Sequence, residues 1–226
     1  MHSANELLLR ISPELGRITV EEHTGKVVSC KEITADVLRG CIRDSMVHHG
    51  YESGFLPPGC LSADLSEQGA RVVMRYPKDR ADISFYETPY PDFPIPRLVF
   101  AFCRSHEGKI SSCRIGVMED ETPRPTTPMY HYPFSNVSNF SGNLCIGMNE
   151  LPIYKSLFKT VTLPGFLLSI PNNLHMFDRE HNRLDLEYRD LLEHLKDKTP
   201  EYYYEHVLIR NGKTLRDFIG TMESEE

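Results

Sequence analysis

Cysteine is the residue type whose chemistry is most open in this chain. The six cysteines are Cys30, Cys41, Cys60, Cys103, Cys113 and Cys145. None of them forms a C-x-x-C pair and their spacing is irregular, so the sequence indicates neither a zinc site nor a disulfide framework. Cys145 differs from the others because Gly142 and Gly147 flank it. A nucleophilic thiol needs access and room for an incoming acyl group, and small residues supply both.

Amide and imidazole side chains lie near Cys145 in the sequence. Asn136 and Asn143 are close enough along the chain to donate a hydrogen bond to a developing oxyanion. His131, or a histidine from residues 175–181, could instead pair with Cys145 as in a thiol hydrolase. Cysteine proteases commonly place the nucleophile at a helix N-terminus, and residues 146–152 do not open a helix cleanly. The hydrolase is therefore the weaker alternative.

The hydrophobic pattern predicts an α+β fold that positions this segment. The pattern predicts two or three short strands within 7–30 and further strands at 72–76, 82–85, 98–103 and 110–118. It predicts helices at 34–48, 184–195, 202–207 and 214–219. Short strands joined by turns imply an antiparallel meander of about four strands, packed on the C-terminal helices. A turn is predicted at Asn211-Gly212. Residues 120–145 show little periodicity, and a long non-regular segment in a compact domain is usually functional.

The same pattern assigns most of the cysteines. Thr34 is placed to cap the first helix, and Cys41 falls on the apolar face of that helix, so we expect it in the core. Cys103 and Cys113 lie inside predicted strands and are also expected in the core. We expect three regions: a strand and helix extension over 1–53 packed on the core, a catalytic domain over 54–220, and an acidic tail over 221–226.

Charge and hydropathy limit the partners. Against 25 Lys+Arg stand 32 Asp+Glu, a formal net charge of −7, which argues against a general nucleic-acid binder. No apolar run approaches the 18–20 residues or so that cross a bilayer, and the N-terminus lacks the basic and apolar regions of a signal peptide. We therefore expect a cytoplasmic protein with reduced cysteines and no membrane partner.

Several short motifs resemble those of ubiquitin-conjugating enzymes. The stretch from Asn136 through Gly142 to Leu144-Cys145-Ile146 is similar to their active-site segment, in which a His-Pro-Asn triplet leads to an apolar-Cys-Leu step. Upstream matches are the runs at 55–59, 95–99, 124–125 and 128–130. Together they resemble the bacterial branch called prokaryotic conjugating-enzyme family D, which includes protein B of a plasmid-borne cassette with an activating-enzyme homologue. The resemblance covers roughly residues 50–196.

This resemblance implies a fold, a reaction and partners. The fold is that of ubiquitin-conjugating enzymes. An activating enzyme, which uses ATP, would pass a ubiquitin-like β-grasp protein to Cys145 as a thioester, and an amine of a target protein would then attack it. The conjugating enzyme itself needs no metal or organic cofactor. Bacterial relatives occur beside a metalloprotease that removes the modifier, and antiphage defence is one setting that the resemblance implies.

The resemblance also implies roles for polar side chains. Asn136 matches the triplet asparagine, which supports the loop and the oxyanion. Phe134-Ser135-Asn136 replaces His-Pro-Asn, so Asn143 stays open as the alternative donor. Asp178 and His175, with His181, occupy the loop that helps to deprotonate the attacking amine. The plainer interpretation is that Asp178 only caps a helix. A non-enzymatic alternative is an inactive binding module of the same fold, although such modules lack the cysteine.

Overall fold

The computed structural model describes residues 6–12, 17–24, 27–45, 52–77 and 79–220. The chain divides between Gly50 and Tyr51 into two compact units, which are described separately below. The turns predicted around 13–16 and 25, the end of the first predicted helix beyond residue 45, and the acidic tail at 221–226 lie outside the described residues.

The N-terminal unit is a three-stranded antiparallel sheet followed by a helix. Its elements are β1 (Glu6–Ser12), β2 (Arg17–Thr24), β3 (Val27–Ile33) and α1 (Ala35–Ser45), with sheet order β1-β2-β3. The predicted cap is confirmed, because the Val37 N–H donates to the Thr34 hydroxyl at 3.2 Å. The core assignment of Cys41 was wrong, since its side chain is exposed. The helical period places Cys41 among apolar neighbours but does not determine whether that face is covered.

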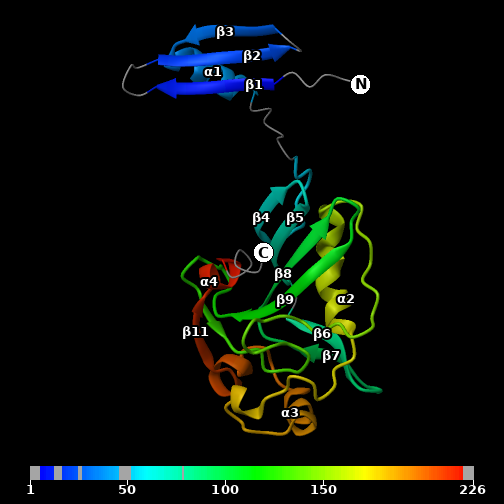
Figure 1. Ribbon diagram of the computed structural model, residues 1–226. Coiled ribbons are helices and arrows are strands. Elements are labelled where there is room, and N and C mark those ends of the chain that lie inside the picture. Colours follow the sequence, from blue (N-terminus) through cyan, green and yellow to red (C-terminus); the bar gives the residue numbers. More distant parts are fainter. Residues whose placement is uncertain (1–5, 13–16, 25–26, 46–51, 78, 221–226) are drawn as a thin grey trace. The chain divides into compact units, whose positions relative to one another are not determined.

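The C-terminal unit is built on a six-stranded antiparallel sheet (Figure 1). Its strands are β4 (Cys60–Ser66), β5 (Gly69–Arg75), β8 (Leu98–Ser105), β9 (Ile110–Met118), β10 (Pro128–Tyr130) and β11 (Arg210–Thr214), in the order β11-β10-β9-β8-β5-β4. The central position of β8 follows from its apolar run, because Leu98 to Phe102 are all buried. The predicted meander is therefore present, and its four consecutive neighbours are β4, β5, β8 and β9.

The predicted strand at 82–85 exists but belongs to another sheet. It lies in β6 (Arg80–Phe85), which forms a two-stranded hairpin with β7 (Thr88–Pro94) outside the main sheet. Three prolines in β7, at positions 89, 91 and 94, explain this separation. Proline has no N–H to give to a strand ladder and is excluded from sheet interiors.

Helical turns make up much of the remaining chain. They are η1 (Phe158–Thr162), α2 (Leu163–Ser169), η2 (Arg179–His181), α3 (Tyr188–Leu195), the π-helix η3 (Tyr203–Val207) and α4 (Leu215–Gly220). The helix predicted from residue 184 begins only at Tyr188, because Asp185 has φ +51° and cannot continue a right-handed helix. The turn predicted at Asn211-Gly212 lies inside β11, which pairs with β10.

Two apolar clusters cover the two faces of the six-stranded sheet. The larger contains Phe100, Phe102 and Ile115 from the strands, with the fully buried Leu191 and Leu192 of α3. The smaller contains residues from the strands and α4, namely Val73, Val99, Ala101, Met118, Met129, Leu215 and Phe218. Cys113 is buried in the larger cluster, as predicted. Cys103, which was also expected in the core, is only partly buried against the smaller one, because it lies towards the end of β8, where burial declines.

Candidate functional site

Cys145 lies in the non-regular segment that follows β10, and this segment runs along the edge of β9. The Ile115 N–H donates to the Gly142 carbonyl at 2.9 Å, and the Leu144 N–H donates to the Cys113 carbonyl at 2.8 Å. These bonds fix the three residues that precede Cys145. The Cys145 side chain is only partly covered, so solvent and an incoming acyl group have access to it.

Asn136 is the junction that connects the cysteine segment to the loop before η2. Its carbonyl accepts from the Cys145 N–H at 2.7 Å, and its own N–H donates to the His175 carbonyl at 2.8 Å. Its side-chain Nδ2 donates to the Pro171 carbonyl at 3.0 Å. Asn136 is 5% exposed and has φ +64°, a left-handed conformation that asparagine tolerates better than most residues. Through these contacts Asn136 joins the cysteine segment to the loop at 171–175.

Asn143 differs from Asn136 in how its side chain is used. Its backbone is held, because its N–H donates to the Ser141 hydroxyl at 3.2 Å and its carbonyl accepts from the Ser138 N–H at 2.9 Å. In the described part of the chain, no hydrogen bond engages its side-chain amide, and the residue is partly exposed. Of the two predicted oxyanion donors, Asn143 is therefore the one whose amide is available, while Asn136 is committed to Pro171.

The loop predicted to deprotonate an amine contacts the cysteine segment through its backbone more than through its side chains. The His175 side chain is exposed, and its contacts are made by its backbone to Asn136 and Asn173. Asp178 accepts from the Glu180 N–H at 2.9 Å as the cap of η2. This is the cap that the plainer interpretation of Asp178 predicts. Its other oxygen lies 3.5 Å from Nδ1 of His181, so the carboxylate also faces an imidazole.

A stacked histidine pair adjoins this loop. The rings of His131 and His181 lie 4.2 Å apart between centroids, with an angle of 11° between their planes. Burial, then the neighbouring His181 and Lys213, hold the pKa of His131 below its ordinary value, against the opposing effect of Asp178. The sequence contained no signal for this pairing, since fifty residues separate the two histidines. Among the described residues, no histidine hydrogen-bonds to the Cys145 thiol, so a preformed Cys-His pair is not observed.

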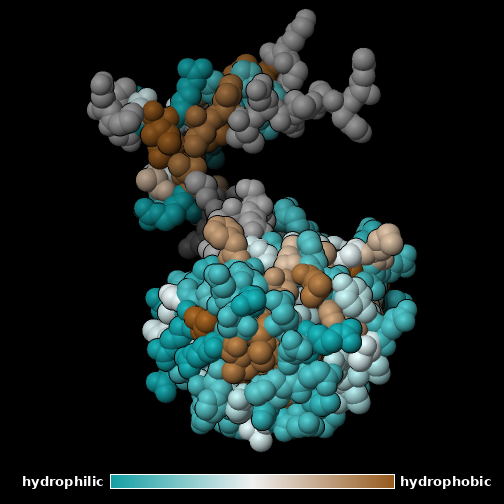
Figure 2. Space-filling model, turned by 90° about the horizontal axis from the view of Figure 1, so that it is seen from below, coloured by the Kyte–Doolittle hydropathy of each residue, from teal (hydrophilic) through white to brown (hydrophobic). Residues whose placement is uncertain are grey.

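Several large apolar side chains are exposed in the cysteine segment and in the loop that Asn136 contacts. Met148 follows three residues after Cys145 and is fully exposed, and Leu174 and Met176 border the carbonyl of His175 that Asn136 contacts. Large apolar side chains exposed together commonly mark a binding surface. Figure 2 shows that apolar patches interrupt an otherwise hydrophilic surface on the face seen there.

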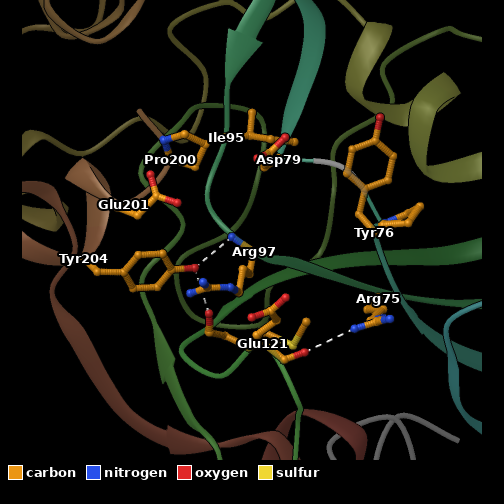
Figure 3. A pocket seen from close by; sticks show the side chains of 11 residues that line it. Arg75, Tyr76, Asp79, Ile95, Arg97, Glu121, Pro200, Glu201 and Tyr204 are labelled. Carbon is orange, nitrogen blue, oxygen red and sulfur yellow. Dashed lines mark hydrogen bonds between the residues drawn. The ribbon is translucent and has the colours of Figure 1, made fainter. Parts of the chain in front are cut away.

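A hollow of about 410 Å³ lies in the C-terminal unit, apart from the cysteine segment (Figure 3). It is lined by Arg75, Tyr76, Pro77, Asp79, Ile95, Arg97, Met118, Glu121, Pro200, Glu201 and Tyr204. The guanidinium groups of Arg75 and Arg97 donate to the carbonyls of Glu121 and Glu119, at 3.1 and 3.0 Å. The Tyr204 hydroxyl accepts from the Arg97 N–H at 2.8 Å. These polar groups are engaged in hydrogen bonds within the protein. No residue predicted for the cysteine site lines the hollow.

Two further features bear on the class of site. Within the described ranges, no group of three or more His, Cys, Asp or Glu side chains is placed to hold a metal ion. The helices in the same ranges include none that is long and apolar enough to cross a membrane.

Comparison with known proteins finds a family match that includes the cysteine segment. The sequence pattern of prokaryotic E2 family D matches residues 41–162, more than half of the chain. The chain therefore belongs to this family of conjugating-enzyme-like proteins, and the match includes Asn136, Asn143 and Cys145. No curated protein and no solved structure matches the chain. The family match ends before α2, so the loop at 171–181 and the helices after it lie outside it.

Proposed function

We propose that this protein is a conjugating enzyme that carries a ubiquitin-like protein as a thioester on Cys145. The observation that carries the proposal is the placement of Cys145. Its thiol is partly exposed while the backbone is held at the preceding residue, by the Cys113 carbonyl, and at its own N–H, by the Asn136 carbonyl. A carrier thiol must be accessible to two large partners in turn, and a fixed backbone keeps it in one position for both.

The reaction consists of two acyl transfers. In the first, the Cys145 thiolate attacks the thioester carbonyl of the modifier on an activating enzyme, a new C–S bond forms, and the thiolate of the activating enzyme leaves. In the second, an amine of the target attacks the new thioester, loses a proton, and releases the Cys145 thiolate. ATP is consumed by the activating enzyme. The conjugating enzyme needs only its own side chains for these transfers.

Each tetrahedral intermediate carries a negative oxygen that needs a donor. The side-chain amide of Asn143 is the candidate, since it is partly exposed, whereas that of Asn136 is buried and donates to Pro171. Asn136 then acts by holding the cysteine segment against the loop at 171–178. Asp178 and the His131–His181 pair are the candidates for accepting the amine proton, because a carboxylate next to an imidazole can pass a proton along. His175 contributes its carbonyl to the same junction.

A reconstituted charging reaction tests the proposal. The protein is mixed with a candidate activating enzyme, its ubiquitin-like protein and ATP, then separated on a non-reducing gel. We expect an adduct that thiols remove and that Cys145→Ala abolishes. Cys60→Ala is the matched control, because Cys60 is also a partly buried thiol of the C-terminal unit and should leave the adduct unchanged.

Other outcomes of this experiment assign the protein differently. No adduct, in the presence of a charged activating enzyme, contradicts thioester transfer. Binding of the modifier without an adduct identifies an inactive binding module. Cleavage of a preformed conjugate by the wild-type protein identifies a thiol hydrolase.

A further inference from the structure

A buried arginine connects the cysteine segment to the C-terminal helix α4. Arg114 of β9 is only 4% exposed. Its Nε donates to the Ser141 carbonyl at 2.9 Å, and its Nη1 donates to the Phe218 carbonyl at 3.5 Å. The guanidinium carbon also lies 5.0 Å from the centroid of the Phe218 ring. One side chain therefore contacts the cysteine segment and α4 together, through hydrogen bonds and a cation–π contact.

The Phe218 ring rests on two glycines. A Cβ at Gly116 would lie 3.0 Å from this ring and 2.6 Å from the Met129 side chain, so the site accepts only glycine without a shift. A Cβ at Gly142 would lie 3.7 Å from the ring, and Gly142 also has φ +77°. The ring thus contacts the sheet at Gly116 and the cysteine segment at Gly142.

Backbone hydrogen bonds hold α4 in this place. The Leu215 N–H donates to the Thr127 carbonyl and the Arg216 N–H to the Pro125 carbonyl, both at 2.9 Å. The preceding strand, β11 (Figure 1), pairs with β10 in the main sheet. Because α4 lies beyond residue 162, this support comes from outside the part of the chain that matches the family.

We infer that Arg114 and Phe218 are positioning residues for Cys145, and that α4 thereby sets the conformation of the cysteine segment. The inference rests on the proposed function. Arg114 fixes Ser141, Phe218 supports Gly142, and the bonds of Gly142 and Leu144 to β9 transmit this order to Cys145. Loosening the support displaces the thiol and the nearby Asn143 amide from each other, which slows acyl transfer without changing how partners bind.

The test compares Phe218→Ala and Arg114→Lys with Val73→Ala. Lysine keeps the charge of Arg114 but cannot donate from a planar fork or stack in the same way. Val73 is the control because it is buried in the same apolar cluster but lies on β5, which β8 separates from β9 and the cysteine segment. Phe218→Tyr is the conservative variant that keeps the ring. All are compared at a temperature where each is folded.

Two readouts decide the outcome. Amide hydrogen exchange at Leu144 should be about ten-fold faster in Phe218→Ala and Arg114→Lys, and unchanged in Val73→Ala and Phe218→Tyr. Discharge of the Cys145 thioester to free lysine should show kcat lowered about ten-fold with KM unchanged in the same two variants. Equal exchange and equal discharge in Phe218→Ala, Arg114→Lys and Val73→Ala would overturn the inference. If wild-type protein forms no thioester, the proposed function fails, and hydrogen exchange alone decides whether α4 orders the segment.

Discussion

Substitutions of Asn136 separate the contribution of its side-chain hydrogen bond to Pro171 from that of its left-handed backbone conformation. Asn136→Ala removes the hydrogen bond from Nδ2 to the Pro171 carbonyl, a loss of about 1 kcal/mol, and puts alanine at φ +64°, which costs about 1–2 kcal/mol. We therefore expect the free energy of unfolding to fall by about 2–3 kcal/mol. Asn136→Gly loses the same bond but tolerates the left-handed backbone, so it should be about 1 kcal/mol more stable than the alanine variant.

Urea unfolding of the three proteins measures these differences, and the charging reaction measures their effect on Cys145. Both variants keep the bond from the Cys145 N–H to the carbonyl of residue 136, so both should still form the thioester. Asn136→Asp is the isosteric variant, and it should be at least as unstable as alanine at neutral pH, because a carboxylate would face the Pro171 carbonyl. Equal stabilities for the alanine and glycine variants would refute the backbone argument. An aspartate variant as stable as wild type would refute the contact with Pro171.

Two other substitutions test the core and the histidine pair. Leu192→Ala should lower the free energy of unfolding by about 3–4 kcal/mol, since this side chain of α3 is fully buried, and a loss below about 1 kcal/mol in urea unfolding would contradict the assigned packing. The lowered pKa of His131 means that the unfolded chain binds more protons near pH 6, so stability is complete above about 6.5 and declines as pH falls through the lower folded value. His131→Gln should flatten this part of the unfolding profile, and an unchanged slope would show that the stacked pair does not titrate in this way.

Periodicity and turn residues were sufficient to predict most regular elements. The apolar run before residue 103 predicted the central strand, and the alternation after 110 predicted the buried face of β9 that contains Cys113. The spacing of Tyr188, Leu191, Leu192 and Leu195 predicted a helix that is fully buried on one face. These signals are local, because each depends on residues a few positions apart.

Features that depend on distant contacts were not predictable. The exposure of Cys41 depends on which other segments cover its helix face, and a hydrophobic period does not contain that information. The stacking of His131 on His181 and the seat of Phe218 on Gly116 join segments that are far apart in the chain. Glycine at position 116, inside an apolar strand pattern, was the one local sign of a close approach.

The candidate site was predictable to different degrees. The glycine-flanked loop and the family motifs selected Cys145, and the structure places it on a fixed backbone beside Asn136. The different roles of Asn136 and Asn143 could not be predicted from the sequence, because they depend on which amide donates to Pro171 in the folded protein. For the same reason, the sequence could not determine that His175 contributes a carbonyl where an imidazole was expected.

The mass of the charged Cys145→Ser variant tests the central claim most directly. Serine at this position should accept the modifier from the activating enzyme as an oxyester, which thiol reductants do not cleave. Intact-mass analysis should show a gain equal to the modifier minus one water, and peptide mapping should place it on residue 145. A modifier found on another residue, or only the unmodified mass when the wild-type activating enzyme is charged, would contradict thioester transfer through Cys145.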